Sequence, residues 1–284
     1  MTIHIAQNSL KQTLTKPYGA QEASNIANLV LEKITGLSRI DRLINKETEL
    51  DALQISLLQK YTQQLIQNRP VQYVLGEADF AGLSFLVDES VLIPRPETEE
   101  LVSWVVETLG QRNVDILDVG TGSGCIAVAL KSKLSNAQIS AIDISLNALN
   151  MAEKNALRNH TKVNFFRVDI LEETAWKDLD EFDCIISNPP YIALNEKESM
   201  AANVLNYEPH SALFVTNSEP LVFYKKIAQF AKLHLKNDGR LFFEINENFG
   251  EEIVGLLQTI GFQNVEIKRD LQGKDRMVNC LFKK

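Results

Sequence analysis

The chain has 284 residues, of which 45% are hydrophobic and 23% charged, and its formal net charge is −8. This length predicts two modest domains or one large one, and the absence of any apolar run of about 18 residues argues against a membrane protein. The acidic balance argues against affinity built from many phosphate contacts, so we expect no stable binding to nucleic acid.

The first residues and the cysteines indicate a cytoplasmic protein. Residues 1–19 lack the basic start, the continuous apolar stretch and the small-residue cleavage site of a secretory signal. The four histidines show no metal-ligand spacing, so we expect no metal site. The three cysteines are widely spaced and predict reduced residues of the core: Cys125, Cys184 and Cys280.

Two amphipathic helices are predicted near the N-terminus. From Ala20 to Ile34, apolar residues recur at steps of three and four, and the same period returns from Leu50 to Leu65. The charged residues of the second stretch fall on the opposite face. We therefore expect a small helical domain over residues 1–68.

A β-hairpin is predicted next, over residues 69–93. This stretch is rich in Val, Tyr, Phe and Leu and is interrupted at Gly76 and at Ala81–Gly82. Such residues around a glycine turn favour two paired strands with the turn near Gly82. We interpret the hairpin as the connector between two domains.

An α/β domain is predicted over residues 94–284. Pro94 and Pro96 favour an extended stretch that runs into a helix with an acidic first turn. Beyond Asn113, short apolar runs alternate with helix-period stretches, and a long helical region leads to about Leu235. This alternation predicts βαβ units and a parallel sheet with helices on both faces. The expected strands are residues 114–119, 138–143, 163–168, 183–187 and 240–245, then 262–270 and 277–284 joined by a polar turn.

A glycine-rich loop follows the first strand of this domain. Its residues are Gly120, Thr121, Gly122, Ser123 and Gly124. Ligands bind outside the carboxyl ends of strands in such folds, and glycine lets the backbone approach them closely. The dinucleotide pattern G-x-G-x-x-G would need glycine at Cys125, so the spacing disfavours a pyrophosphate. The loop resembles the first motif of the Rossmann-like methyltransferases, which packs against the methionine part of S-adenosylmethionine; a glycine turn without a ligand is the alternative.

Acidic residues end the next two predicted strands. Asp143 lies about 20 residues beyond the glycine loop, where a carboxylate can accept both hydroxyls of a ribose. Asp169 ends the third strand, and there Asp169 and Ile170 would border an adenine ring. Helix capping is the alternative role for such aspartates, but their register after consecutive strands favours a cofactor site.

The segment Asn188-Pro189-Pro190-Tyr191 follows the fourth predicted strand and opens on the same rim as the glycine loop. Two prolines remove two N–H donors and leave carbonyls free, and the Asn188 side chain adds another acceptor. These groups fit a planar NH2 group gripped by the Asn188 oxygen and the Pro189 carbonyl, with Tyr191 packed on the substrate. Such a grip positions nitrogen for in-line attack on a sulfonium methyl and needs no strong base. An ordinary surface turn is the alternative.

Several segments together closely resemble the release factor glutamine methyltransferase family. The most specific part is the combination of IPRPETE with NPPYI, and the resemblance covers nearly the whole chain. It implies a Rossmann-like class I methyltransferase domain with a mostly parallel seven-stranded sheet, a small N-terminal helical domain and a connecting β-hairpin. The matching segments are residues 69–76, 91–102, 118–127, 188–192, 208–213 and 270–276.

The resemblance also implies an activity. This is methyl transfer from S-adenosylmethionine to N5 of the glutamine in the Gly-Gly-Gln loop of class I peptide chain release factors. The helical domain and the hairpin would contact the release factor, and we expect a monomer. By position, residues 120–124, Asp143 and Asn188 match the cofactor site, and residues 188–191 match the substrate motif.

Other activities remain open at this point. An adenine N6 methyltransferase uses similar residues on an exocyclic amine, although the acidic balance and the lack of a basic target-recognition domain oppose it. Glutamine methylation of a ribosomal protein is not separated from release factor methylation by chemistry. A non-enzymatic cofactor-binding protein would leave residues 188–191 without a purpose.

Two places depart from the family pattern, Asn246 and residues 217–220, and both lie away from the predicted chemistry. The family often has glycine where Asn246 stands. Apart from glycine, asparagine is the residue that best tolerates a positive φ. Glu208 lies in a matching segment, but the sequence predicts no role for it.

Overall fold

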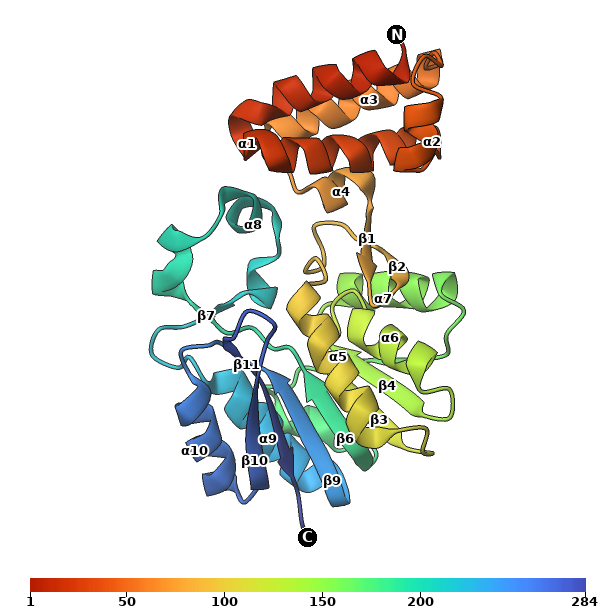
Figure 1. The fold of residues 1–284 in the computed structure, drawn as a ribbon. Coiled ribbons are helices and arrows are strands. Elements are labelled where there is room, and N and C mark those ends of the chain that lie inside the picture. Colours follow the sequence, from red (N-terminus) through yellow and green to blue (C-terminus); the bar gives the residue numbers. More distant parts are fainter. The chain divides into compact units, whose positions relative to one another are not determined.

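The computed structural model describes all 284 residues apart from the side chain of Ser199, and the chain divides into two compact units (Figure 1). The first unit comprises Met1–Gly76 and Ala201–Tyr207, and the second comprises Glu77–Met200 and Glu208–Lys284. Each unit has a buried apolar core of its own. Across the described part of the chain, no helix combines the length and the apolar character needed to span a bilayer.

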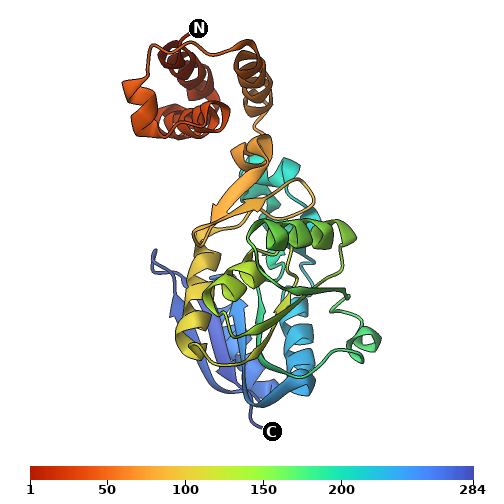
Figure 2. The same ribbon diagram turned by 90° about the vertical axis from the view of Figure 1, so that its right-hand side faces the viewer.

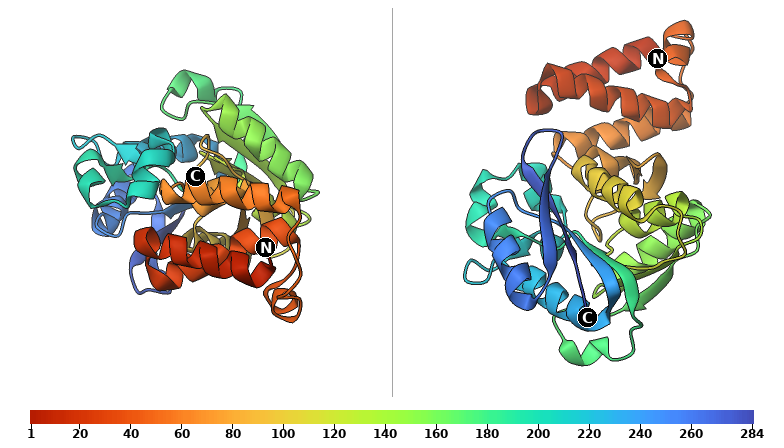
Figure 3. Two further views of the ribbon diagram at one scale, coloured as in Figure 1. Left: turned by 90° about the horizontal axis from the view of Figure 1, so that it is seen from above. Right: turned by 60° about the horizontal axis from the view of Figure 1, so that its bottom comes forward.

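The first unit is helical. It contains α1 (Ile3–Thr35), α2 (Arg39–Ile44), α3 (Ala52–Ile66), α4 (Val71–Leu75) and α8 (Ala202–Tyr207). Helices α1 and α3 lie side by side, as the view from above in Figure 3 shows. Asp51 and Gln54 form a capping box that begins α3, with the Asp51 carboxylate accepting from the Gln54 N–H at 2.8 Å.

Both predicted helices are confirmed, but α1 begins much earlier than the sequence indicated. It starts at Ile3 rather than near Ala20, and the chain continues through Pro17 with a kink at Gly19, where φ is 77°. The proline and the glycine therefore bend this helix instead of preceding it. Its first half buries apolar residues at helical spacing: Ile3, Ala6, Leu10 and Leu14.

The stretch predicted as a hairpin begins with a helix. Residues 71–75 form α4, which ends at Gly76, and the hairpin consists of β1 (Glu77–Phe80) and β2 (Leu83–Leu86). The turn near Gly82 is confirmed: Ala81 and Gly82 have positive φ angles of 52° and 82°, as a type I′ turn requires. The compact units separate at Gly76, whereas the domain boundaries at residues 68 and 93 stay predictions.

A seven-stranded sheet organises the second unit. Its order is β10-β11-β9-β6-β3-β4-β5, and every pair is parallel except the two that involve β11. Figure 3 shows β10 and β11 beside β9 at the edge of the sheet. The mostly parallel seven-stranded sheet is thus confirmed. Its strands are β3 (Asp115–Val119), β4 (Gln138–Asp143), β5 (Asn164–Arg167), β6 (Phe182–Ser187), β9 (Leu235–Glu244), β10 (Gln263–Arg269) and β11 (Asp275–Leu281).

Helices cover both faces of the sheet (Figures 1 and 2). One face packs against α5 (Pro96–Leu109), α6 (Cys125–Lys133) and α7 (Leu146–Arg158), and the other against α9 (Val222–His234) and α10 (Gly250–Ile260). Helix α5 begins at Pro96 with an acidic first turn, as predicted. The three cysteines are buried and free, which confirms them as core residues.

The predicted long helical region before Leu235 is wrong, and α10 was not predicted. Only α9 is a regular helix within the second unit's part of that region. The chain before it is cut by prolines and polar residues into pieces too short to hold a helical period. These pieces are β7 (Ile192–Ala193) and β8 (Phe214–Val215), which pair in parallel, and the 3-10 turns η2 (Leu194–Ser199) and η3 (His210–Ala212); another such turn, η1 (Glu173–Trp176), precedes β6.

Candidate active site

A cavity of about 280 Å³ lies at the carboxyl ends of the parallel strands in the second unit. Its walls come from the segments that follow β3, β4, β5 and β6 and from residues 90–95. Further lining residues are Thr98, Pro209, Ser211, Ala212, Phe223 and Ile227. This is the position at which open α/β sheets bind ligands. Most of the predicted site residues line it: Gly120, Thr121, Gly122, Ser123, Asp143, Asp169, Ile170, Asn188, Pro189 and Pro190.

The glycines of this loop serve two different purposes. Gly120 and Gly122 line the cavity with positive φ angles of 74° and 54°, and a β-carbon on either would meet no atom within 4 Å. Gly124 does not line the cavity. A β-carbon there would lie 2.9 Å from the β-carbon of Ala152, so Gly124 allows α6 to begin close against α7. The expected close approach to a ligand therefore fits the first two glycines, while the third serves helix packing.

Asp143 is oriented by the backbone of the glycine loop. Its Oδ2 accepts a hydrogen bond from the N–H of Gly122 at 2.9 Å, and its Oδ1 accepts from the N–H of Ser145 at 2.8 Å. Burial raises the pKa of the Asp143 carboxyl, and these N–H donors oppose that rise. Each carboxylate oxygen has a second lone pair, which can accept a hydrogen bond from a hydroxyl of a ligand in the cavity.

Asp169 and Ile170 form another wall of the cavity. The Asp169 carboxylate accepts from the N–H of Leu171 at 2.9 Å, which turns the chain after β5. The indole N–H of Trp176 donates to the carbonyl of Ile170 at 3.1 Å and holds that residue in place. An apolar side chain beside a fixed carboxylate suits a flat, polar ring such as adenine.

Asn188 leads the proline segment and is held by Thr98, which also lines the cavity. Its side-chain NH2 donates to the hydroxyl of Thr98 at 3.1 Å. Ser187, the residue before it, donates its hydroxyl to the carbonyl of Val119 at 2.7 Å and ties β6 to β3. Asn188, Pro189 and Pro190 therefore face the same space as the glycine loop.

Tyr191 does not line the cavity. Its hydroxyl donates to Oε1 of Glu244 at 3.3 Å, and burial raises the pKa of this phenol well above its ordinary value. Asn246 donates its NH2 to the Tyr191 carbonyl at 3.4 Å, and it is not among the residues with positive φ, contrary to expectation. The tyrosine thus anchors the proline segment to the core in this structure, where packing on a substrate had been predicted.

Glu208 joins two walls of the cavity. Its carboxyl side chain is 1% exposed and accepts from the N–H of Ile93 at 3.2 Å and from the guanidinium of Arg95 at 2.5 Å. Ile93 and Arg95 line one wall, and Pro209, which follows Glu208, lines another. This ion pair, in which the carboxylate is buried and the arginine partly exposed, gives Glu208 the structural role that the sequence left open.

Asp118 was also missed by the sequence prediction. It is fully buried near the end of β3, and its Oδ2 accepts from the hydroxyl of Thr121 at 2.6 Å. Burial raises the pKa of Asp118 to about 7, although the Thr121 hydrogen bond opposes this. The signal in the sequence was a second acidic residue in β3, which begins with Asp115, at two positions before the glycine loop.

Comparisons with known proteins match the whole chain. The PrmC N-terminal domain family matches residues 6–76, and the methyltransferase small domain family matches residues 98–216. A release factor glutamine methyltransferase from Flavobacterium psychrophilum is 43% identical over 100% of both chains. Another, from Bacteroides thetaiotaomicron, is 38% identical over 95% of this chain and 97% of its own.

A solved structure supports the fold. The crystal structure of a methyltransferase from Pyrococcus furiosus has a TM-score of 0.53 and 19% identity, and the match covers 71% of this chain and 89% of that one. At this identity the likeness concerns the fold alone, whereas the two bacterial relatives match this chain in sequence over 95% or more of its length. The chain therefore belongs to the release factor glutamine methyltransferase family.

Proposed function

We propose that the protein transfers a methyl group from S-adenosylmethionine to N5 of the glutamine in the Gly-Gly-Gln loop of class I peptide chain release factors. The observation that carries this proposal is the position of Asn188, Pro189 and Pro190 in the same cavity as the glycine loop and Asp143. The family membership supports it with relatives of that name over the full length.

The cavity fits S-adenosylmethionine. Gly120 and Gly122 leave room beside the backbone for the methionine part, and Asp143 presents acceptors for ribose hydroxyls. Asp169 and Ile170 offer a polar and an apolar contact for adenine. When bound, the cofactor supplies an electrophilic methyl group on a sulfonium. Backbone N–H donors, one carboxylate and apolar side chains would hold it in place.

The proline segment would grip the substrate amide. The side-chain oxygen of Asn188 and the carbonyl of Pro189 accept the two N–H hydrogens, and this fixes the nitrogen in line with the methyl group. As the nitrogen–carbon bond forms and the carbon–sulfur bond breaks, the sulfur keeps the bonding pair and the nitrogen becomes more positive. Both acceptors then bind it more strongly. The methylated nitrogen loses its proton to water, so no side-chain base is needed.

The remaining parts of the proposal concern the partner and the setting. We assign residues 1–68 to recognition of the release factor, residues 69–93 to a connector that shares in this contact, and residues 94–284 to methyl transfer. The net charge of −8 supports a protein substrate in preference to nucleic acid. We place the reaction in the cytoplasm, on a monomeric enzyme that uses no metal.

The test is mass spectrometry of a class I release factor after incubation with the protein and isotope-labelled S-adenosylmethionine. We expect one labelled methyl group on the glutamine of the Gly-Gly-Gln loop. A release factor with glutamate in place of that glutamine is the matched control and should take no label. Label on adenine or on a ribosomal protein, with none on the release factor, would refute the proposal.

A further inference from the structure

A line of hydrogen bonds connects the cavity to a carboxylate in the core of the second unit. The NH2 group of Asn188 donates to the hydroxyl of Thr98 at 3.1 Å, and that hydroxyl donates to Oε2 of Glu244 at 2.6 Å. Thr98 lies in the first turn of α5, and Glu244 ends β9; both are 2% exposed. Three elements that are distant in sequence thus meet behind the residue predicted to hold the substrate.

The chemistry of these groups determines which of them donates and which accepts in each hydrogen bond. An ionised carboxylate only accepts hydrogen bonds, so the single hydroxyl hydrogen of Thr98 goes to Glu244. The threonine oxygen is then left as an acceptor, and it takes a hydrogen from the NH2 group of Asn188. An amide carries its oxygen and its nitrogen on opposite sides, so Oδ1 of Asn188 is turned away from Thr98.

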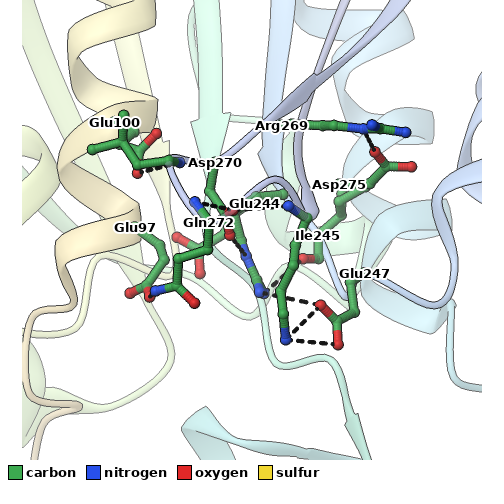
Figure 4. A network of polar contacts seen from close by, with 12 residues as sticks. Glu97, Glu100, Glu244, Ile245, Glu247, Arg269, Asp270, Gln272 and Asp275 are labelled. Atoms are coloured by element: carbon green, nitrogen blue, oxygen red, sulfur yellow. Dashed lines mark hydrogen bonds and ion pairs between the residues drawn. The ribbon is translucent and has the colours of Figure 1, made fainter.

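Several contacts favour the ionised, accepting form of Glu244. The hydroxyl of Tyr191 donates to its other oxygen at 3.3 Å. Burial and the negative charge of Glu97 raise the pKa of Glu244 above its ordinary value. The Thr98 hydrogen bond, the positive charge of Arg276 and the Tyr191 hydrogen bond oppose that rise. The Arg276 guanidinium donates to the carboxylate of Asp270 at 3.2 Å and to the carbonyl of Ile245 at 3.4 Å. Figure 4 labels both acceptor residues together with Glu244.

We propose that Glu244, acting through Thr98, is a positioning group that fixes the Asn188 amide with its oxygen toward the substrate nitrogen. This inference rests on the proposed function, in which that oxygen accepts an N–H of the glutamine amide. With the opposite orientation, the NH2 of Asn188 would face the NH2 of the substrate, and two donors would meet. A hydroxyl that donated to Asn188 would impose that wrong orientation, and the acceptor at Glu244 prevents it.

The test separates hydrogen bonding from packing at Thr98. Thr98→Val keeps the shape of the side chain and removes the hydroxyl, whereas Thr98→Ser keeps the hydroxyl and removes a methyl group. Thr108→Val is the matched control, since Thr108 lies on the same helix and its hydroxyl donates to the carbonyl of Trp104 at 2.8 Å. The measurements are kcat and KM for a release factor, the Kd for S-adenosylmethionine and the melting temperature.

We expect Thr98→Val to lower kcat by about 5-fold to 50-fold, because one orienting hydrogen bond is lost. Thr98→Ser should stay within about 3-fold of the unaltered enzyme, and Thr108→Val should leave kcat unchanged. Glu244→Gln should lower kcat over the same range as Thr98→Val, because an amide can donate to Thr98. The double variant should lose little more than either single one, since both changes break one line of contacts. The Kd for S-adenosylmethionine should change by less than about 3-fold.

Three results would overturn the inference: full kcat in Thr98→Val, equal losses in Thr98→Ser and Thr98→Val, or additive losses in the double variant. A readout without turnover is the side-chain amide signal of isotope-labelled Asn188 in magnetic resonance. It should shift in Thr98→Val and Glu244→Gln and remain in Thr98→Ser. If the signal behaves so but no release factor is methylated, the proposed function alone fails. An identical signal in every variant refutes the positioning role alone.

Discussion

The carboxylate of Glu208 is paired with the guanidinium of Arg95 at 2.5 Å, although the two residues are 113 positions apart in sequence. The glutamate side chain is 1% exposed and the arginine side chain 32%. This carboxylate also accepts a hydrogen bond from the N–H of Ile93. The pair joins the segment before α5 to the segment after α8, and so it determines the shape of one end of the cavity.

Removing Arg95 should therefore destabilise the protein. In Arg95→Leu, a buried carboxylate loses its cationic partner. We expect the free energy of unfolding to fall by about 1 to 3 kcal/mol, a smaller loss than for a fully buried pair because the arginine is partly exposed. Arg269→Leu is the control, because its ion pair with Asp275 is exposed, and it should cost less than about 1 kcal/mol. Urea denaturation measures both; equal losses would mean that burial does not strengthen the Glu208 pair.

Asn188→Ala should affect turnover far more than cofactor binding. It removes an acceptor that binds the amide most strongly as its nitrogen becomes positive, a contribution of about 2 to 4 kcal/mol. We expect kcat to fall about 30-fold to 1000-fold in single-turnover methylation of a release factor. The Kd for S-adenosylmethionine should stay close to that of the unaltered enzyme. A normal rate would show that residues 188–191 form only a turn.

Asp143→Ala should show the reverse pattern. The carboxylate is placed by the N–H groups of Gly122 and Ser145, and its remaining lone pairs would accept ribose hydroxyls. Loss of a charged acceptor should weaken binding of S-adenosylmethionine by about 1.5 to 3 kcal/mol. Titration calorimetry gives this number directly. An unchanged Kd would mean that other residues hold the ribose.

Two glycine-to-alanine changes should act on stability with opposite signs. In Gly124→Ala, the new methyl group would lie 2.9 Å from the β-carbon of Ala152 at a φ of 80°, so we expect a loss of about 1 to 3 kcal/mol. Gly255 lies inside α10 with nothing within 4 Å of such a methyl group, and Gly255→Ala should gain about 0.5 to 1 kcal/mol. Thermal unfolding tests both. A harmless Gly124→Ala would contradict the close contact between α6 and α7.

Asp118 should make stability depend on pH. Its pKa of about 7 in the folded chain lies above the ordinary value of 3.8, so the folded state holds a proton that the unfolded state has lost. Stability from this group is full below about pH 4 and falls as the pH rises to about 7. Asp118→Asn keeps an acceptor for Thr121 but cannot ionise. The difference in unfolding free energy between Asp118→Asn and the unaltered protein should therefore shift by about 1 to 4 kcal/mol in favour of the variant between pH 4 and pH 8. Parallel curves would contradict the prediction.

The sequence alone determined the α/β order and the rim on which the chemistry lies. Short apolar runs marked the strands of the parallel sheet. The motifs after β3, β4, β5 and β6 had to meet because parallel strands end on one side. Local signals failed where two structures share one pattern. Pro17 and Gly19 interrupt the helical signal but only kink α1, and the apolar residues of α4 suit a strand equally well.

Tertiary structure decided the partners of the functional residues. Nothing local shows that Asn188 is linked to Glu244 through Thr98, that Arg95 reaches Glu208, or that Tyr191 bonds Glu244. Those contacts depend on which strands are neighbours and on how closely helices pack, as Gly124 against Ala152 shows. The place of a motif at the end of a strand determines which residue meets the ligand. The orientation of that residue's side chain is set by hydrogen bonds from elements far along the chain, and only the packed fold brings these together.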